Sequence, residues 1–439
     1  MRRADPPYAQ RVTTTLPGPD EEVAGDQPEV TALLVPREGV PPVVDSAAQL
    51  AEVVARFAAG TGPVAVDAER ASGYRYSQRA YLVQLRRRGA GTALIDPIAC
   101  PDLSLLGRVL QGDEWVLHAA SQDIACLAEV GLVAPAVFDT ELAGRLAGFE
   151  RVGLGAMVEN VLGLRLEKGH SAADWSTRPL PQEWLVYAAL DVEVLVELRD
   201  ELAVELERQG KLDWAYEEFE AVRTAPPAPP RLDPWRRVSG SQRLRSRRQL
   251  AAVRAMWELR DRMARSRDTA PGRILPDSAI IAAVTAAPTT VAELVALSVF
   301  GGRSTRRHAH TWLQALRSAA ALGEGDLPKP VGGGDAPPPP ARWGERDPAA
   351  ARRLTRLRAQ ISALAEAHHL PAENLVQPDA VRRLAWSPPQ PADEPAVRAA
   401  LASSGVRAWQ LGLTVTALTA ALPEPPAPAP DLPAVLLPE

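Results

Sequence analysis

Four carboxylates stand beside apolar runs that should be buried, and this combination strongly constrains what the chain can fold into. They are Asp67 and Glu69 in Val-Asp-Ala-Glu, Asp123 after His-Ala-Ala-Ser-Gln, and Asp191 in Tyr-Ala-Ala-Leu-Asp. A buried negative charge costs several kcal/mol unless a cation or a hydrogen-bond donor compensates it. A fold that gathers these carboxylates around a shared metal site meets that cost.

The local patterns place the carboxylates on particular elements. Asp67 and Glu69 end a short β-branched run, and residues two apart on a strand face the same side, so both can contact one ion. Tyr187 and Asp191 are four residues apart in a predicted helical stretch, 181–209, and share one helix face. Asp123 follows the apolar run 115–117, and we expect it in the first turn of a helix capped by Ser121.

Each of these motifs also has an ordinary explanation. An Asp-X-Glu at a strand end is usually a turn or a solvated edge, and an Asp early in a helix usually compensates the helix dipole. The combination is much rarer than its parts. Oxygen ligands without Cys or His partners suit magnesium or manganese, and several carboxylates can hold two such ions about 3.5 to 4 Å apart.

The motifs and their order resemble the DEDD exonucleases that carry a tyrosine in the third motif, and within them the ribonuclease D family. The resemblance rests on five segments: Val66 to Glu69, His118 to Asp123, Phe138 to Thr140, Asp174 to Leu180, and Tyr187 to Asp191. It implies an RNase H-like mixed α/β sheet and removal of nucleotides from RNA 3′ ends.

The resemblance also implies a role for each site residue. Asp67, Glu69, Asp123 and Asp191 would bind two Mg²⁺ or Mn²⁺ ions, and Tyr187 would orient the attacking water. Because an unperturbed tyrosine has a pKa of about 10, orienting water suits Tyr187 better than abstracting a proton. No organic cofactor is expected.

Further residues are candidate substrate contacts. Arg70 stands where many relatives carry an aromatic residue, so the way in which the last nucleotide is held differs here. Arg178 can contact phosphate or brace Asp174. The full set of candidates is Arg70, Gln84, His118, Lys168 and Arg178.

The order of predicted elements supports the fold independently of the motifs. Three strands are followed by alternating helices and strands, which makes a mixed α/β sheet. The predicted strands are 64–67, 81–85, 93–95, 115–117 and 137–138, with helices near 103–110 and after Ser121.

Positive charge is concentrated in residues 231–320. This segment has 17 Arg and no Lys against 6 acidic residues, a formal charge of +11, whereas the whole chain carries −5. Neutralising phosphates with basic side chains releases counterions, so a basic segment indicates nucleic-acid binding. The preference for Arg over Lys, 46 against 3, fits a compositional bias of the genome, but such a bias does not place a net positive charge in one segment.

The basic segment resembles an HRDC domain, a small helical module. Its pattern is an amphipathic helix over 249–265, the sequence Arg273-Ile-Leu-Pro-Asp277, an apolar helix through Val284 and a last helix through Trp312. The resemblance implies an auxiliary role in nucleic-acid binding. Residues 349–421 show a weaker form of the same sequence pattern, which predicts a second HRDC-like module. Because this module is only slightly basic, we expect it to pack against other parts or to position substrate more than to bind phosphate.

Composition predicts the borders of these parts. Pro-rich or Gly-rich segments separate the modules, and two buried, reduced cysteines are too few for a four-ligand zinc site. No stretch reaches the roughly 18 apolar residues needed to cross a bilayer, so we expect a cytoplasmic protein with no membrane partner. The predicted parts are a disordered segment 1–40, the exonuclease 41–220, a linker 221–235, the first HRDC domain 236–322, a linker 323–345, a second HRDC-like domain 346–422 and a tail 423–439.

The sequence therefore predicts a metal-dependent 3′-to-5′ exoribonuclease that acts on single-stranded RNA ends, with tRNA precursors as the substrate that the resemblance implies. A DNA exonuclease on the same scaffold is the nearest alternative. A non-catalytic RNA-binding protein is disfavoured because no metal carboxylate is missing. The helical modules can also bind protein in place of nucleic acid, and no particular protein partner is indicated.

Overall fold

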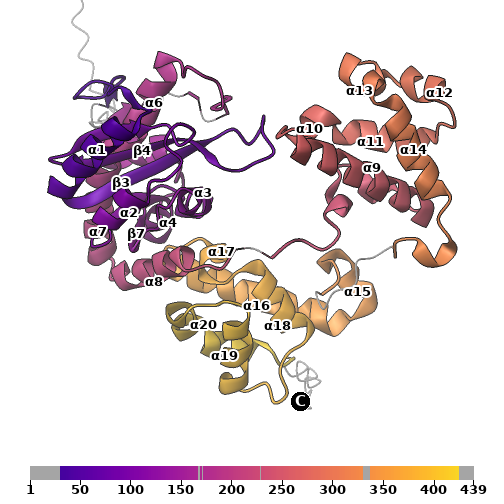
Figure 1. Ribbon diagram of the computed structural model, residues 1–439. Helices are drawn as coiled ribbons and strands as arrows, with labels where there is room; N and C mark the ends of the chain where they lie inside the picture. Colours follow the sequence, from indigo (N-terminus) through magenta and orange to yellow (C-terminus); the bar gives the residue numbers. More distant parts are fainter. Residues whose placement is uncertain (1–29, 167–168, 171, 228, 330–336, 425–439) are drawn as a thin grey trace, which may run out of the picture.

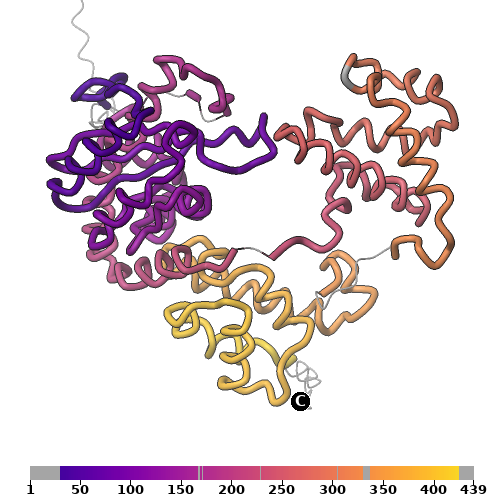
Figure 2. Tube along the Cα trace, in the orientation of Figure 1, coloured from indigo at the N-terminus to yellow at the C-terminus, as the bar shows by residue number. Residues whose placement is uncertain are grey.

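The chain forms three parts, an α/β nuclease followed by two helical modules. The computed structural model describes residues 30–166, 169–170, 172–227, 229–329 and 337–424. Figure 1 shows the nuclease on one side, the first helical module opposite it, and the second module below the nuclease. The trace in Figure 2 shows that the chain leaves the nuclease, builds the first module, and returns to the nuclease in the second.

A six-stranded mixed sheet forms the centre of the nuclease. Its strand order is β2-β5-β4-β3-β6-β7, with β3 antiparallel to β4 and parallel to β6. The apolar run 64–66 in the middle of β3 is buried on both faces, as a continuous apolar run favours. The strands are β2 (Val43–Val44), β3 (Thr61–Arg70), β4 (Ala80–Arg88), β5 (Gly91–Ile95), β6 (Glu114–Leu117) and β7 (Ala136–Asp139).

Helices cover both faces of this sheet. Even-numbered positions of β3, such as Val66, pack with α1, α2 and α3, whereas Ala65 packs with Val192 and Leu195 from α6 and α7. Asp67 and Glu69 continue the odd-numbered face, so the alternation of the strand directs them toward α6. The helices are α1 (Ala47–Ala59), α2 (Ser104–Val109), α3 (Ile124–Glu129), α4 (Thr140–Ala147), α5 (Leu154–Leu162), α6 (Gln182–Glu193), α7 (Leu195–Arg208) and α8 (Leu212–Arg223).

Three predictions differ from the structure. The segment 1–40, predicted to be disordered, contains strand β1 (Thr31–Leu33), which pairs with β8 (Leu164–Leu166), and the backbone N–H of Arg37 donates to Glu193. The single helix predicted over 181–209 is divided at Val194 into α6 and α7. Residues 1–29 and the end of the predicted tail, 425–439, lie outside the described residues.

The third difference concerns Ser121, which caps no helix. It lies within a short 3-10 turn (Ala120–Gln122), and Asp123 immediately precedes α3 instead of lying in its first turn. The backbone turns here because Ala119 adopts a left-handed conformation with φ of 61°. Sequence propensity alone does not indicate such a conformation for alanine.

The first helical module has its own core around Trp312 and Phe300. Its long helix begins at a capping box formed by Ser246 and Gln249, which satisfies free N–H groups at the helix start. The three predicted helices of this module are confirmed as α9 (Arg247–Ser266), α11 (Asp277–Ala286) and α14 (Ala309–Ala320). Three short helices that were not predicted lie between them: α10 (Pro271–Ile274), α12 (Val291–Ala296) and α13 (Arg303–Arg307).

The loop between β3 and β4 joins this module to the nuclease. In Figure 1 the loop extends from the sheet toward α10. The Tyr76 hydroxyl donates to Asp261 at 3.0 Å, Asp268 accepts from the Ser77 N–H at 2.9 Å, and the Arg273 guanidinium lies over the Tyr74 ring. The first helical module therefore holds the loop that directly follows the strand of Asp67 and Glu69.

The second helical module shares a hydrophobic core with the nuclease. Leu202 and Phe219 of the nuclease belong to the same buried cluster as Leu357 and Leu418 of this module. Its helices are α15 (Trp343–Arg346), α16 (Pro348–Ala367), α17 (Ala372–Leu375), α18 (Pro378–Trp386), α19 (Glu394–Ser403) and α20 (Ala408–Ala421).

Two remaining expectations concern the membrane and the thiols. Within the described residues, no helix combines the length and the apolar character needed to span a bilayer. Cys100 and Cys126 are buried free thiols, as expected; Cys126 lies on α3, and Cys100 lies in the loop between β5 and α2.

Candidate active site

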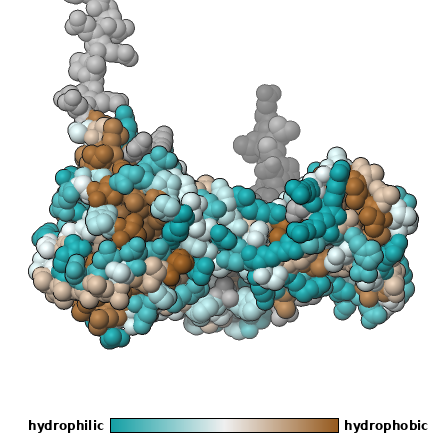
Figure 3. Space-filling view, turned by 45° about the horizontal axis from the view of Figure 1, so that its top comes forward, coloured by the Kyte–Doolittle hydropathy of each residue, from teal (hydrophilic) through white to brown (hydrophobic). Residues whose placement is uncertain are grey.

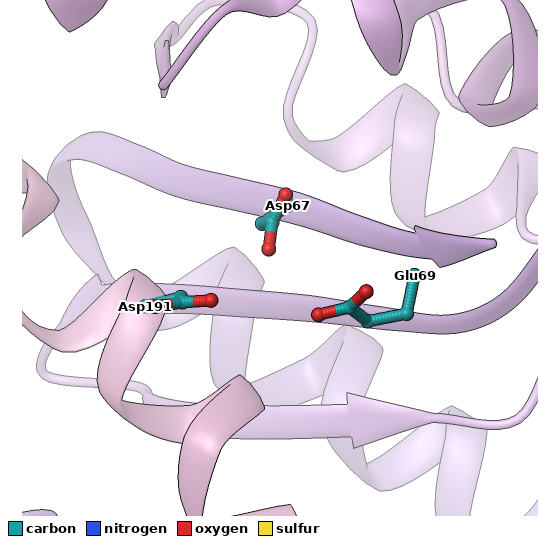
Figure 4. Close-up of side chains that lie close together, drawn as sticks. All are labelled: Asp67, Glu69 and Asp191. Atoms are coloured by element: carbon teal, nitrogen blue, oxygen red, sulfur yellow. The ribbon is translucent and has the colours of Figure 1, made fainter. Parts of the chain in front are cut away.

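Three of the four predicted carboxylates meet between β3 and α6. Oxygens of Asp67, Glu69 and Asp191 lie within 4.8 Å of one another (Figure 4). Glu69 is buried, and the other two are partly exposed. The alternation of β3 and the position of Asp191 on the facing helix bring together acids that are more than 120 residues apart in sequence.

Gln84 supports this cluster from the neighbouring strand. It stands opposite Asp67 in the β3–β4 register and is fully buried. Its side-chain amide donates to Oδ2 of Asp67 at 2.9 Å. The structure thus places Gln84, a candidate substrate contact, beneath the carboxylates, where it orients Asp67.

Burial and mutual repulsion dominate the electrostatics of the cluster. Burial, followed by the charges of Asp67, Asp191 and Asp123, raises the pKa of Glu69 well above its ordinary value. Burial and the charge of Asp67 also raise the pKa of Asp191 well above its ordinary value. Positive charge from outside the chain would favour the ionised form of these groups.

Asp123 lies beside the cluster and faces a cation of the chain itself. Its Oδ1 is 3.5 Å from Nη2 of Arg70, and the same guanidinium is 3.4 Å from the Gln122 side-chain oxygen. Burial, followed by the charge of Asp67, raises the pKa of Asp123 to about 8, although Arg70 acts in the opposite direction. The charge of Asp67 therefore acts on Asp123. Asp123 does not belong to the group of three described carboxylates whose oxygens lie within 4.8 Å of one another.

Asp139 holds the backbone that presents Asp123. One of its carboxylate oxygens accepts from the N–H groups of Ala119 and Glu141, at 3.0 and 2.9 Å, and the other accepts from Ala120 at 2.9 Å. These hydrogen bonds stabilise the left-handed backbone conformation of Ala119. The sequence identifies Asp139 only as part of a motif, because the spacing of residues does not predict its hydrogen-bond partners.

Tyr187 lies one helical turn before Asp191 and is hydrogen-bonded to it. Burial, followed by the charges of Asp191 and Glu69, raises the pKa of the phenol above its ordinary value. Tyr187 therefore stays protonated and can donate a hydrogen bond, which supports its predicted role in orienting water.

The remaining candidate contacts have different surroundings. His118 bonds to Thr140 at 2.9 Å, and burial lowers its pKa to about 4, so the ring is neutral at pH 7. Arg178 braces Asp96, at 2.7 and 2.9 Å, and not Asp174, and it also donates to the Tyr81 carbonyl. Lys168 lies outside the described residues. Their contact with substrate stays a prediction.

A cleft of about 830 Å³ adjoins the carboxylates. Tyr187 and Asp191 line it, together with Arg151, Asn160 and Arg165 from the segment that contains α5 and β8. These three residues were not predicted from the sequence, because nothing in their local pattern distinguishes them from ordinary surface residues. They are brought to the site only by the packing of α5 against α7 and β8.

Comparisons with known proteins agree with this geometry. Residues 41–207 match a family model described as 3'-5' exonuclease, and residues 249–316 match the HRDC domain. The second helical module, predicted as HRDC-like, matches over residues 336–422 a model described as 3' to 5' exonuclease C-terminal domain. Ribonuclease D of Acidiphilium cryptum is 33% identical over 359 residues, which span 79% of this chain and 86% of that protein. The chain belongs to the ribonuclease D family.

Solved structures extend the match to the whole architecture. A protein from Bifidobacterium adolescentis is 37% identical with a TM-score of 0.83, covering 90% of this chain and 100% of that one. Escherichia coli RNase D, described as an exoribonuclease involved in structured RNA processing, is 27% identical with a TM-score of 0.64, covering 87% of this chain and 98% of that one. The ribonuclease D family, the mixed α/β nuclease fold and the 3′-5′ exoribonuclease activity that the sequence predicted are therefore confirmed, whereas the exact domain borders stay predictions.

The donor set of this ribonuclease D family member fits a divalent metal. All four candidate ligands are carboxylates, and Cys126 near Asp123 is turned to the backbone carbonyl of that residue. Oxygen-only donors favour hard ions such as Mg²⁺ and Mn²⁺. Asp67, Glu69 and Asp191 would hold one ion, and Asp123 stands beside them to share another.

The raised pKa of Asp123 predicts a pH-dependent stability. Its folded pKa of about 8 exceeds the ordinary value of 3.8, so its contribution is complete below about pH 4 and is lost as the pH rises toward 8. In chelator, the wild type should lose stability as the pH rises from 5 to 8, whereas Asp123→Asn should not. Over this range we expect the unfolding free energy of the variant to rise by roughly 1–3 kcal/mol relative to that of wild type. Urea unfolding at several pH values measures this difference. Parallel pH profiles for the two proteins would contradict it.

Proposed function

We propose that the protein removes nucleotides one at a time from single-stranded RNA 3′ ends, using two divalent ions held by Asp67, Glu69, Asp123 and Asp191. Precursors of tRNA are the proposed natural substrates. The proposal adds three points to the exoribonuclease activity of the family: the RNA end that is attacked, the requirement for metal ions, and the residues that bind these ions.

One observation carries the proposal. Asp67, Glu69 and Asp191 converge within 4.8 Å at the end of a cleft that is lined by the phenol of Tyr187. Ions bound at such a site lower the pKa of a water molecule and stabilise the leaving 3′ oxygen. The carboxylates position the metal ions, Gln84 fixes the orientation of Asp67, and the phenol of Tyr187 orients the nucleophilic water.

The cleft offers contacts for the RNA chain beside the carboxylates. Arg151 and Arg165 supply positive charge for phosphates, and Asn160 supplies a polar group for a base or sugar. Arg165 is paired with Glu159 at 3.2 Å and would exchange this partner for a phosphate. The 3′ end would therefore reach the carboxylates along α5.

The first HRDC domain provides a second place for phosphate contacts. Arg303, Arg306 and Arg307 of α13 are exposed, and Arg267 reaches the same region through His308 at 3.0 Å. Within the part of the chain that the structure describes, the three α13 arginines form no ion pair with a carboxylate, whereas Arg260 and Arg265 of α9 do. Figure 3 shows a band of hydrophilic side chains across the middle of the molecule. Longer RNAs would gain affinity here without base specificity.

Degradation of matched oligonucleotides tests the proposed function. Wild-type protein is expected to shorten 5′-labelled single-stranded RNA stepwise from the 3′ end with Mg²⁺ or Mn²⁺, and to stop when EDTA is added. The same RNA blocked at its 3′ end should persist. Internal cleavage, or activity that survives chelation, would contradict the proposal.

The DNA alternative is separated in the same assay. A DNA oligonucleotide of identical sequence, digested at equal protein and metal concentrations, is expected to be shortened more slowly than the RNA. Faster digestion of the DNA would favour the DNA exonuclease, while binding of RNA without shortening would favour a non-catalytic RNA-binding protein.

A further inference from the structure

Arg70 places a positive charge against the fourth carboxylate of the site. Its Nη2 lies 3.5 Å from Oδ1 of Asp123 and 3.4 Å from Oε1 of Gln122. The side chain of Arg70 is 25% exposed, whereas that of Asp123 is 7% exposed. The guanidinium therefore reaches from the solvent edge to a buried carboxylate.

This contact divides the four carboxylates into two groups. Asp67, Glu69 and Asp191 converge, and the amide of Gln84 stabilises the first of them. Asp123 stands next to these three and already has a cation of the chain as its partner. A divalent ion that needs Asp123 must share that carboxylate with Arg70 or displace it.

The contact between Arg70 and Asp123 is suited to exchange. Both distances from the guanidinium lie beyond the usual range of about 2.7–3.2 Å for such hydrogen bonds, so little is lost when they open. A guanidinium also presents a planar fork that matches two oxygens of a phosphate group. A nucleotide phosphate near the metal ligands is therefore a better partner for Arg70 than the one oxygen of Asp123 and the one oxygen of Gln122 that it now faces at 3.5 and 3.4 Å.

We infer that Arg70 competes with a divalent ion for Asp123, and that a nucleotide phosphate relieves this competition by binding the guanidinium. The inference rests on the proposed function, because it concerns the same carboxylates. It assigns Arg70 a ligand, the non-bridging oxygens of a phosphate. As a consequence, the second ion and the nucleotide bind cooperatively, and each raises the affinity of the other by the same factor.

Calorimetric titration of the full chain with Mn²⁺, with and without adenosine 5′-monophosphate, tests the inference. This nucleotide resembles a reaction product and is not consumed. Without nucleotide, Arg70→Gln is expected to bind the second Mn²⁺ at least about tenfold more tightly than wild type, because a unit charge next to Asp123 is removed. With nucleotide, the affinity of wild type for the second ion should rise more than that of Arg70→Gln.

Two further variants separate charge from geometry. Arg70→Lys keeps the charge and should leave the second Mn²⁺ as weak as in wild type, but it should reduce the effect of the nucleotide, because an ammonium lacks the planar fork. Arg88→Gln removes an exposed arginine at the far end of the neighbouring strand β4 and should behave as wild type. Thermal unfolding of each variant in chelator shows that it is folded.

Equal affinities for the second ion in wild type and Arg70→Gln, or an equal effect of the nucleotide on both, overturn the inference. The proposed function is judged separately by RNA hydrolysis in the wild type. If wild type degrades RNA while the titrations of the two proteins coincide, only the role of Arg70 fails. If wild type degrades no RNA, the proposed function itself fails.

Discussion

Replacement of Asp191 by asparagine is expected to reduce the rate of RNA hydrolysis by roughly 10³-fold or more. Metal ions contribute several kcal/mol of transition-state stabilisation, and each 1.36 kcal/mol corresponds to a factor of ten in rate. Asp191 lies within 4.8 Å of both Asp67 and Glu69, so its loss removes one side of the ion-binding cluster. Single-turnover degradation of labelled RNA with saturating Mg²⁺ measures the effect.

The same substitution should stabilise the protein in the absence of metal. Asp191 carries a carboxylate whose pKa is raised well above its ordinary value, first by burial and then by the charge of Asp67, so its ionised form at pH 7 costs folding energy. We expect Asp191→Asn to raise Tm in chelator by at least about 2 °C. The rise in Tm that Mn²⁺ gives the wild type should be smaller in the variant.

A carboxylate outside the site provides the matched control. Asp200 lies on α7, is about half exposed at 53%, and pairs with Arg199. Asp200→Asn makes the same chemical change and should leave both hydrolysis and the response to Mn²⁺ as in wild type. If Asp191→Asn retains activity within a factor of ten of wild type, the assignment of this carboxylate as a metal ligand is wrong.

The parts of the site that the sequence predicts are those fixed by local periodicity. The two-residue spacing of Asp67 and Glu69 and the four-residue spacing of Tyr187 and Asp191 each determine a shared face once the strand or helix is recognised. The resemblance to a family then places both faces in one pocket. The structure agrees because tertiary packing preserves these local periods.

The parts that the sequence does not predict depend on partners far along the chain. Arg178 bonds to Asp96, which is 82 residues away, and Asp139 fixes the turn at Ala119 through backbone N–H groups that any residue type possesses. The pairing of Arg70 with Asp123 likewise requires the relative positions of β3 and α3. Spacing and composition contain no information on these distances.

The packing of the second helical module against the nuclease also depends on residues far apart along the chain, and the sequence did not predict it. Linkers rich in proline and glycine suggested a separate domain, yet the indole of Trp409 stacks on that of Trp214 in α8, with ring centres 4.9 Å apart and planes at 10°. The Trp409 indole N–H donates to Glu218 at 3.0 Å, and buried Lys211 donates to the carbonyls of Leu146 and His369. The module thus completes the core of the nuclease.

This shared core predicts that Trp409→Ala destabilises the nuclease itself. Trp409 is 8% exposed, and truncating a buried tryptophan costs about 3–5 kcal/mol. The variant is expected to lose RNase activity on heating at a temperature several degrees below that of wild type, although the substitution is not in the nuclease domain. Residual activity after incubation at increasing temperatures measures the shift.

Trp312→Ala is the matched control, because Trp312 is equally a buried indole, at 1% exposure, but belongs to the separate core of the first helical module. It should unfold that module while leaving the inactivation temperature on short RNA close to that of wild type. The comparison therefore distinguishes a shared core from a general effect of removing a tryptophan. Equal inactivation temperatures for Trp409→Ala and Trp312→Ala would show that the second helical module folds independently of the nuclease, and that the stacked indoles contribute little to holding them together.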